Sequence, residues 1–274
     1  MKPAPVPMLT MALLLGSPLA HAAASCSRSV VDLGSYGLWT DLQGTGDTTV
    51  VFEAGGGADS TVWADIAPQV QALGLKTLVY DRAGLGRSEP RPGDYTIGRD
   101  AQDLRTLLDR CGVTGRVLIV SHSYGGFVTV LTAATDRRVA GLVLVDANVP
   151  GYFTQARLDA LLAEYRPRYA ELRAQAPRLA AAMIPMMEAY PASARAAEEA
   201  RLPDGLPIID IVAEHSWATN PADAQAMRDA HAAFVRGSNA RSSVFAAGSS
   251  HDVMHDRPAL IVDAVKRMAT GARP

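Results

Sequence analysis

The stretch "RVLIVSHSYGGFVTVLTAAT" at residues 116–135 decides how the rest of the chain is interpreted. Its first half is an almost continuous run of Val, Leu and Ile, which is typical of a strand buried on both faces of a parallel sheet. Its second half reads as a helix, and Ser123 lies at the junction. A serine at a tight turn from strand to helix exposes its hydroxyl beside the positive end of the helix dipole. The stretch therefore predicts a nucleophilic serine on an α/β fold.

Similar apolar runs recur along the chain and alternate with helix-like segments. We expect strands at 48–54, 76–81, 116–121, 140–147, 206–213 and 241–247. We expect helices near 62–73, 98–111, 124–135, 221–236 and 258–269. This alternation predicts a doubly wound α/β fold with a mostly parallel sheet and right-handed crossovers.

One insertion interrupts the alternation. The segment 151–203 is rich in Ala, Arg, Leu and Met and too long for an ordinary loop, so it predicts a helical cap over the sheet's carboxyl edge. The core is then expected in two parts, 23–150 and 204–274. Large cap side chains either line a pocket or only attach the cap to the core. They are Tyr152, Phe153, Met183, Met186, Met187 and Tyr190.

The N-terminal residues predict export. Lys2 precedes the apolar stretch "MLTMALLLGSPLA", and small residues lead up to Ala22, so residues 1–22 are expected to be a secretory signal peptide. The apolar run is short for a membrane span, although an uncleaved anchor is the alternative. We expect a periplasmic or secreted protein with no stable membrane span after cleavage. The only two cysteines, Cys26 and Cys111, are then expected to form a disulfide, unless Cys111 is simply a buried apolar residue.

Composition narrows the class of partner. The chain has 274 residues, 48% of them hydrophobic and 20% charged, which is enough for one large domain with its own core. The formal net charge of -2 shows no basic excess, which argues against a nucleic-acid partner. The glycines at 55–57 lack the lysine and the spacing of a phosphate-binding loop, so no cofactor is expected. A small molecule is the expected partner.

Together with Ser123, three further motifs resemble the α/β-hydrolase family of serine hydrolases and esterases, and the resemblance covers nearly all of the chain after the signal peptide. "VVFEAGGGADSTVW" at 50–63 is similar to the family's oxyanion loop, and "VYDRAGLGRSEP" at 79–90 resembles its structural D-R-x-G-x-G-x-S segment. The third motif, "AAGSSHDVMHDRP" at 246–258, resembles the family's histidine loop. Ser121 replaces the first glycine of G-x-S-x-G, and a small residue still fits there. The resemblance implies a triad of serine, histidine and an acid.

The resemblance places the general base at His251, after the last strand. Imidazole is the side chain whose ordinary pKa suits proton transfer near neutral pH. His255 is the alternative, but it falls at the entrance of the final helix. Spacing of four between these histidines also allows a metal reading, with Asp252 and Asp256 nearby. No glutamate follows His251 as in H-E-x-x-H, so no metal is expected.

The acid has two candidates. The family often places it after the seventh strand, where the count ends on Ser216, which cannot serve, and Glu214 lies nearby. The family also uses the end of the sixth strand, where "LVLVDANVP" presents Asp146. A carboxylate there can orient His251 and stabilise its protonated form. We prefer Asp146, keep Glu214 as the alternative, and note that Asp146 could instead cap a turn.

The oxyanion hole requires two convergent N–H groups rather than particular side chains. The resemblance assigns them to Gly56 and Tyr124, and consecutive glycines allow the close backbone approach. His122 is expected to pack beside the nucleophile rather than act as the base. Trp63 and Trp217 either border the pocket or belong to the core.

The expected function is that of an exported serine hydrolase that cleaves an ester, or an amide or lactone, through an acyl-enzyme. One alternative is a cofactor-free haloperoxidase or an acyltransferase with the same triad. Another is a periplasmic binding protein that has lost activity. The sequence does not identify the substrate, because a shared fold implies a shared reaction only where the site residues match.

Overall fold

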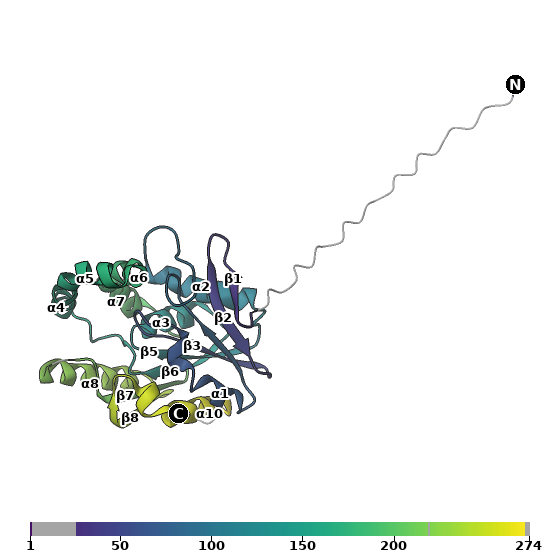
Figure 1. Cartoon of the computed structure of the whole chain (residues 1–274). Helices are drawn as coiled ribbons and strands as arrows, with labels where there is room; N and C mark the ends of the chain where they lie inside the picture. Colours follow the sequence, from purple (N-terminus) through teal and green to yellow (C-terminus); the bar gives the residue numbers. More distant parts are fainter. Residues whose placement is uncertain (2–25, 219, 272–274) are drawn as a thin grey trace.

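An eight-stranded sheet, in the order β1-β2-β4-β3-β5-β6-β7-β8, forms the centre of the molecule (Figure 1). The computed structural model describes Met1, residues 26–218 and residues 220–271. The strands are β1 (Ser29–Asp32), β2 (Gly37–Gln43), β3 (Thr48–Glu53), β4 (Lys76–Tyr80), β5 (Arg116–His122), β6 (Val139–Val145), β7 (Ile208–His215) and β8 (Arg241–Ser250). The six strands predicted from the sequence are β3 to β8, which run parallel, so the predicted fold class is confirmed. The predicted signal peptide and its cleavage site lie outside the described residues.

The two antiparallel strands, β1 at the edge of the sheet and β2 between β1 and β4, were not predicted. Their sequences, "SVVD" and "GLWTDLQ", are short and mix polar with apolar residues. Several side chains of both strands are exposed or only partly buried, so the strands lack the continuous apolar run by which the central strands were predicted.

Helices cover both faces of the sheet. On one face lie α1 (Ala67–Gln71) and α10 (Pro258–Ala269), and on the other lie α2 (Ile97–Arg110), α3 (Gly125–Thr135) and α8 (Pro221–Arg236). Along β5, Ile119 belongs to one apolar cluster and the next residue, Val120, to the other. This burial on both sides explains why the central strands read as continuous apolar runs. The predicted helix at 62–73 is in fact a 3₁₀ turn, Ser60–Trp63, followed by the short α1.

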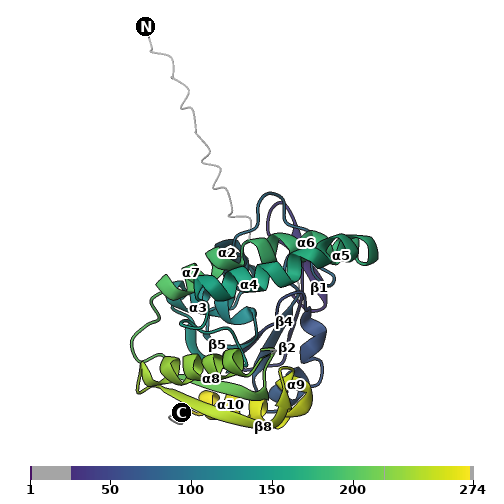
Figure 2. The ribbon, with the colours of Figure 1, turned by 90° about the vertical axis from the view of Figure 1, so that its left-hand side faces the viewer.

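Four α-helices and a 3₁₀ turn lie between β6 and β7 and form a layer on one side of the core (Figure 2). They are α4 (Gln155–Tyr165), η2 (Arg166–Arg168), α5 (Tyr169–Gln175), α6 (Pro177–Glu188) and α7 (Tyr190–Glu199). Pro177 and Pro191 stand in the first turns of α6 and α7, where a missing N–H costs nothing. We call these helices the cap.

Cys26 and Cys111 form a disulfide with a Cα–Cα distance of 5.6 Å. The bond joins the segment before β1 to the residue that follows α2, across 85 positions of sequence. A crosslink over so long a loop restricts the unfolded chain strongly. No helix in the described part of the chain is both long and apolar enough to cross a membrane.

A buried ion pair joins α8 to β7 and makes stability depend on pH. His231 Nδ1 lies 2.9 Å from Asp210 Oδ2, and both side chains are almost fully buried. Burial favours the neutral ring, but the Asp210 carboxylate outweighs it and raises the pKa of His231 above its ordinary value. The stabilising contribution is therefore complete below about pH 6.5 and is lost as pH rises through the raised pKa. We expect the Tm difference between the wild type and His231→Gln to be larger at pH 6 than at pH 9.

Thermal unfolding at several pH values checks this prediction. His215→Gln is the matched control, because that histidine lies on β7 with a largely exposed side chain. Its Tm should differ from the wild type by an amount that changes little with pH. Parallel curves for the wild type and His231→Gln would contradict the prediction.

Candidate active site

Ser123 occupies the sharp turn between β5 and α3. Its φ of +51° lies in the left-handed region, which a non-glycine residue adopts at a cost. The turn is held by its neighbours: the Ser123 carbonyl accepts a hydrogen bond from the Asn148 amide at 2.8 Å. A Cβ added at Gly125 would lie 2.7 Å from the Ala54 carbonyl oxygen, so only glycine fits behind the serine. The backbone geometry is that of a nucleophile elbow.

Asp146 and His251 lie together at the carboxyl edge of the sheet. Asp146 follows β6 with a φ of +41°, and His251 follows β8. The distance between His251 Nδ1 and Asp146 Oδ2 is 2.6 Å. The Ala213 amide donates to Asp146 Oδ1 at 3.1 Å, and the Ser216 hydroxyl donates to Oδ2 at 2.5 Å. The carboxylate thus accepts three hydrogen bonds in a buried position.

These contacts keep Asp146 ionised. Burial alone would raise the pKa of the carboxyl, but the hydrogen bond and charge of His251, together with the Ser216 hydroxyl, hold it below its usual range. An ionised carboxylate at Nδ1 fixes the ring tautomer and leaves Nε2 available as a base. Sequence reasoning rejected Ser216 as the acid and missed this supporting role.

The two other candidates for the acid and the base lie apart from this pair. Glu214 remains within β7, and its Oε2 accepts a hydrogen bond from the Gly248 amide at 2.6 Å. His255 lies on the exposed side of the short helix α9 (Val253–Asp256). The structure therefore brings Asp146, and not Glu214, to His251.

Ser123 and His251 line the same cavity, which has a volume of about 700 Å³. Within the described residues no hydrogen bond joins the two side chains. Such contacts are often long in an enzyme without substrate and shorten when the substrate binds. Gly56 and Tyr124 line this cavity too, and a Cβ added at Gly56 would lie 3.4 Å from Tyr124 Cβ. The two residues expected to supply the oxyanion donors are therefore neighbours beside Ser123.

Arg82 holds the loop that carries Gly56. Its guanidinium donates to the carbonyl oxygens of Ala54 and Gly55, each at 2.5 Å, and pairs with the buried carboxylate of Glu53. Burial would lower the pKa of Arg82, but the Glu53 charge raises it, so the side chain stays charged. The sequence indicated only a turn here, and the link to the oxyanion loop was missed.

The cap supplies the roof of the cavity. All six cap side chains singled out in the sequence line it, as does Trp217. Trp63 does not: it is fully buried and packs against Phe52, with ring centroids 5.4 Å apart. Sequence reasoning also missed an ion pair in the cavity wall, between Arg157 of α4 and Asp223 of α8, with 3.1 Å between Nε and Oδ1.

His122 and Tyr124, on either side of Ser123, tie it to other elements of the fold. His122 Nε2 lies 3.0 Å from the His251 carbonyl oxygen, and the two rings are 4.4 Å apart. Burial first, and then the charge of His251, lower the pKa of His122 to about 3, so its ring is neutral and donates to that carbonyl. The Tyr124 hydroxyl donates to Ser193 Oγ of α7 at 3.0 Å. The turn at Ser123 is thus bonded to the His251 loop and to the cap.

No group of three or more His, Cys, Asp or Glu side chains in residues 26–218 and 220–271 is arranged to hold a metal ion. The two histidines considered as metal ligands do not face a common site: His251 is bonded to Asp146, and His255 is exposed at the surface. The donors present are those of proton transfer and anion binding.

Comparison with known proteins gives matches over most of the chain. A sequence model described as the alpha/beta hydrolase family matches residues 50–264. The uncharacterized protein YqjL of Bacillus subtilis is 26% identical over 235 residues, which are 80% of this chain and 82% of that protein. The enol-lactonase of Burkholderia xenovorans has 21% identity and a TM-score of 0.61, covering 88% of this chain and 100% of that one. A thermophilic esterase of Thermogutta terrifontis has 21% identity and a TM-score of 0.59, covering 87% of this chain and 95% of that one.

Proposed function

Because the chain belongs to the alpha/beta hydrolase family, we propose that it is a serine hydrolase that cleaves carboxylic esters through an acyl-enzyme on Ser123. The observation that carries the proposal is the hydrogen bond between His251 and Asp146, at the wall of the cavity that Ser123 lines. The solved esterase and lactonase share only the fold at their level of identity, so the choice of reaction rests on the chemistry of the site.

In the proposed reaction His251 Nε2 takes the proton of Ser123 Oγ as the oxygen attacks the ester carbonyl. The amides of Gly56 and Tyr124 donate to the oxyanion that forms. The bond to the alcohol then breaks, and His251 returns its proton to the leaving oxygen. Water, deprotonated by His251, attacks the acyl-enzyme, and His251 returns that proton to Ser123 Oγ as the acid is released. Asp146 stays ionised and stabilises the protonated ring at each step.

Export belongs to this proposal. The signal-like residues 1–22 support it, and so does the disulfide between Cys26 and Cys111, since such bonds persist in oxidising compartments. The proposed place of action is the periplasm or the medium.

Labelling with a fluorophosphonate probe, beside a panel of 4-nitrophenyl acyl esters, tests the proposed reaction. We expect the probe to modify one peptide, the one that contains Ser123, and to abolish ester turnover in step with labelling. A protein that is neither labelled nor active on any ester would be the binding protein instead. Acyl transfer to an added alcohol that outpaces hydrolysis would assign it as an acyltransferase, and halide-dependent bromination with peroxide as a haloperoxidase.

A further inference from the structure

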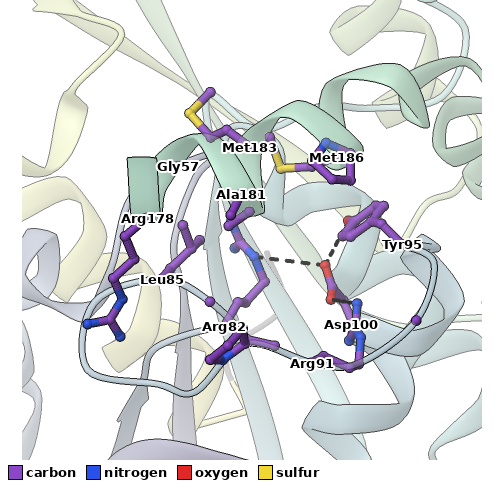
Figure 3. Close-up of a pocket in the computed structure, with 16 residues that line it drawn as sticks. Gly57, Arg82, Leu85, Arg91, Tyr95, Asp100, Arg178, Ala181, Met183 and Met186 are labelled. Atoms are coloured by element: carbon purple, nitrogen blue, oxygen red, sulfur yellow. Dashed lines mark hydrogen bonds and ion pairs between the residues drawn. The ribbon is translucent and has the colours of Figure 1, made fainter. Parts of the chain in front are cut away.

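A second pocket of about 340 Å³ lies beside the catalytic cavity, between the segment after β4, the start of α2 and helix α6 (Figure 3). The two spaces have only Met183 and Met186 in common. These side chains rest on the oxyanion loop: a Cβ added at Gly57 would lie 2.5 Å from Met183 Sδ, and one at Gly56 3.2 Å from Met186 Cε. Met183 and Met186 therefore form part of the partition between the two pockets. Methionine is unbranched and adapts its shape, so a ligand can displace it.

The order of the strands decides which part of an ester faces this partition. Asp146 and His251 follow β6 and β8, on one side of the β5 strand that leads to Ser123. The second pocket borders the residues after β4, on the opposite side of β5. His251 must reach the leaving oxygen, so the alcohol part lies on its side. The acyl chain then points away from His251, toward Met183 and the second pocket.

The walls of the second pocket suit a chain of methylene groups. Most of the lining is apolar, and it includes Ala83, Leu85, Pro90, Ala181, Ala182 and Pro185. Two of the three arginines in the wall already have carboxylate partners: Arg82 pairs with Glu53, and Arg91 pairs with Asp100 at 2.9 Å (Figure 3) and with Asp103 at 2.6 Å. These charges are compensated inside the protein.

Arg178, near the start of α6, differs from the other two. Its Nη2 donates to the Ser88 carbonyl oxygen at 2.8 Å, and no carboxylate among the described residues pairs with it. Its remaining N–H groups have no acceptor in the part of the chain that the structure describes. A guanidinium presents a planar set of donors that matches a carboxylate. The pocket thus combines an apolar wall with one arginine that has no carboxylate partner among the described residues.

We propose that the second pocket holds the far end of the acyl chain and that this end is a carboxylate bound by Arg178. The preferred substrates are then monoesters of dicarboxylic acids, with an apolar chain between the scissile ester and the free acid. This inference rests on the proposed ester hydrolysis at Ser123 and adds the class of acyl group.

Two matched series of 4-nitrophenyl esters test the inference, unbranched alkanoyl esters and carboxyalkanoyl esters of the same chain length, from hexanoyl and adipoyl upward. The readout is the kcat/KM for the carboxyalkanoyl ester divided by the kcat/KM for the alkanoyl ester of the same chain length. We expect Arg178→Gln to lower this ratio at least about threefold, since the contact is partly exposed to solvent. Arg173→Gln removes one exposed positive charge from α5, outside both pockets, and should leave the ratio unchanged.

Ala181→Phe tests the path of the chain separately, because Ala181 is exposed and lines only the second pocket. It should lower kcat/KM for long acyl chains several times more than for the acetyl ester. Equal ratios for Arg178→Gln and Arg173→Gln, or an unchanged length profile in Ala181→Phe, would overturn the inference. Wild type that is inactive on every ester of both series and takes no fluorophosphonate label would overturn the proposed hydrolysis instead, so the two failures are distinct.

Discussion

Ser123→Ala is expected to lower kcat by about 10⁴-fold or more on the best 4-nitrophenyl ester, since no other group in the cavity replaces the attacking oxygen. Binding and oxyanion contacts remain, so KM should change far less than kcat. Steady-state kinetics together with fluorophosphonate labelling measure the effect. The expected outcome is a folded protein that takes no label.

Ser121→Ala is the matched control for this loss. Ser121 lies two residues away, is fully buried, and its hydroxyl has no partner within the described residues. Removing that oxygen should change kcat by no more than about twofold and should retain labelling. A reversed ranking, with Ser121→Ala inactive and Ser123→Ala active, would assign the nucleophile to Ser121.

Asp146→Asn is expected to lower kcat by about 10³- to 10⁴-fold with little change in KM. An amide accepts only at one atom, so the bonds from Ala213, Ser216 and His251 cannot all be kept, and the negative charge that stabilises protonated His251 is lost. Stopped assays with purified variants, checked by circular dichroism for an intact fold, give the comparison.

Glu214→Gln provides the contrast. Its side chain bonds to the Gly248 amide and not to His251, and an amide oxygen can still accept that bond. We expect kcat within about twofold of the wild type. A larger loss in Glu214→Gln than in Asp146→Asn would move the acid to β7.

The fold could be read from the sequence wherever a strand is covered on both faces. There the apolar run is continuous, as in β5, and its length and bounding turns identify it. β1 and β2 escape this signal because several of their side chains are exposed or only partly buried and their sequences mix polar with apolar residues. The candidate site follows the same rule, since Ser123, Asp146 and His251 each come directly after a strand.

The sequence left open which carboxylate is the acid and did not reveal the role of Arg82, because both depend on how neighbouring strands are paired and where they end. The choice between Asp146 and Glu214 depends on how far β7 extends, and that strand continues to His215, so Glu214 turns toward β8. The role of Arg82 could have been inferred from one feature of the sequence. Glu53 is a carboxylate at the end of a strand expected to be buried, and a buried charge requires a partner. The partner of Glu53 is Arg82, which follows the next strand along the chain.

Tyr124 uses both its backbone amide and its side-chain hydroxyl at the site, and this limits which cap helices can be replaced without affecting the turn at Ser123. Its amide belongs to the proposed oxyanion hole, while its hydroxyl is bonded to Ser193 of α7 and lies 2.8 Å from that of Tyr95. Helix α7 is therefore bonded to the residue that follows Ser123, and α6 contacts Gly56 and Gly57 through Met186 and Met183. A grafted cap therefore needs a hydrogen-bond partner at position 193 and side chains that pack on Gly56 and Gly57, in addition to a wall that fits the new acyl group.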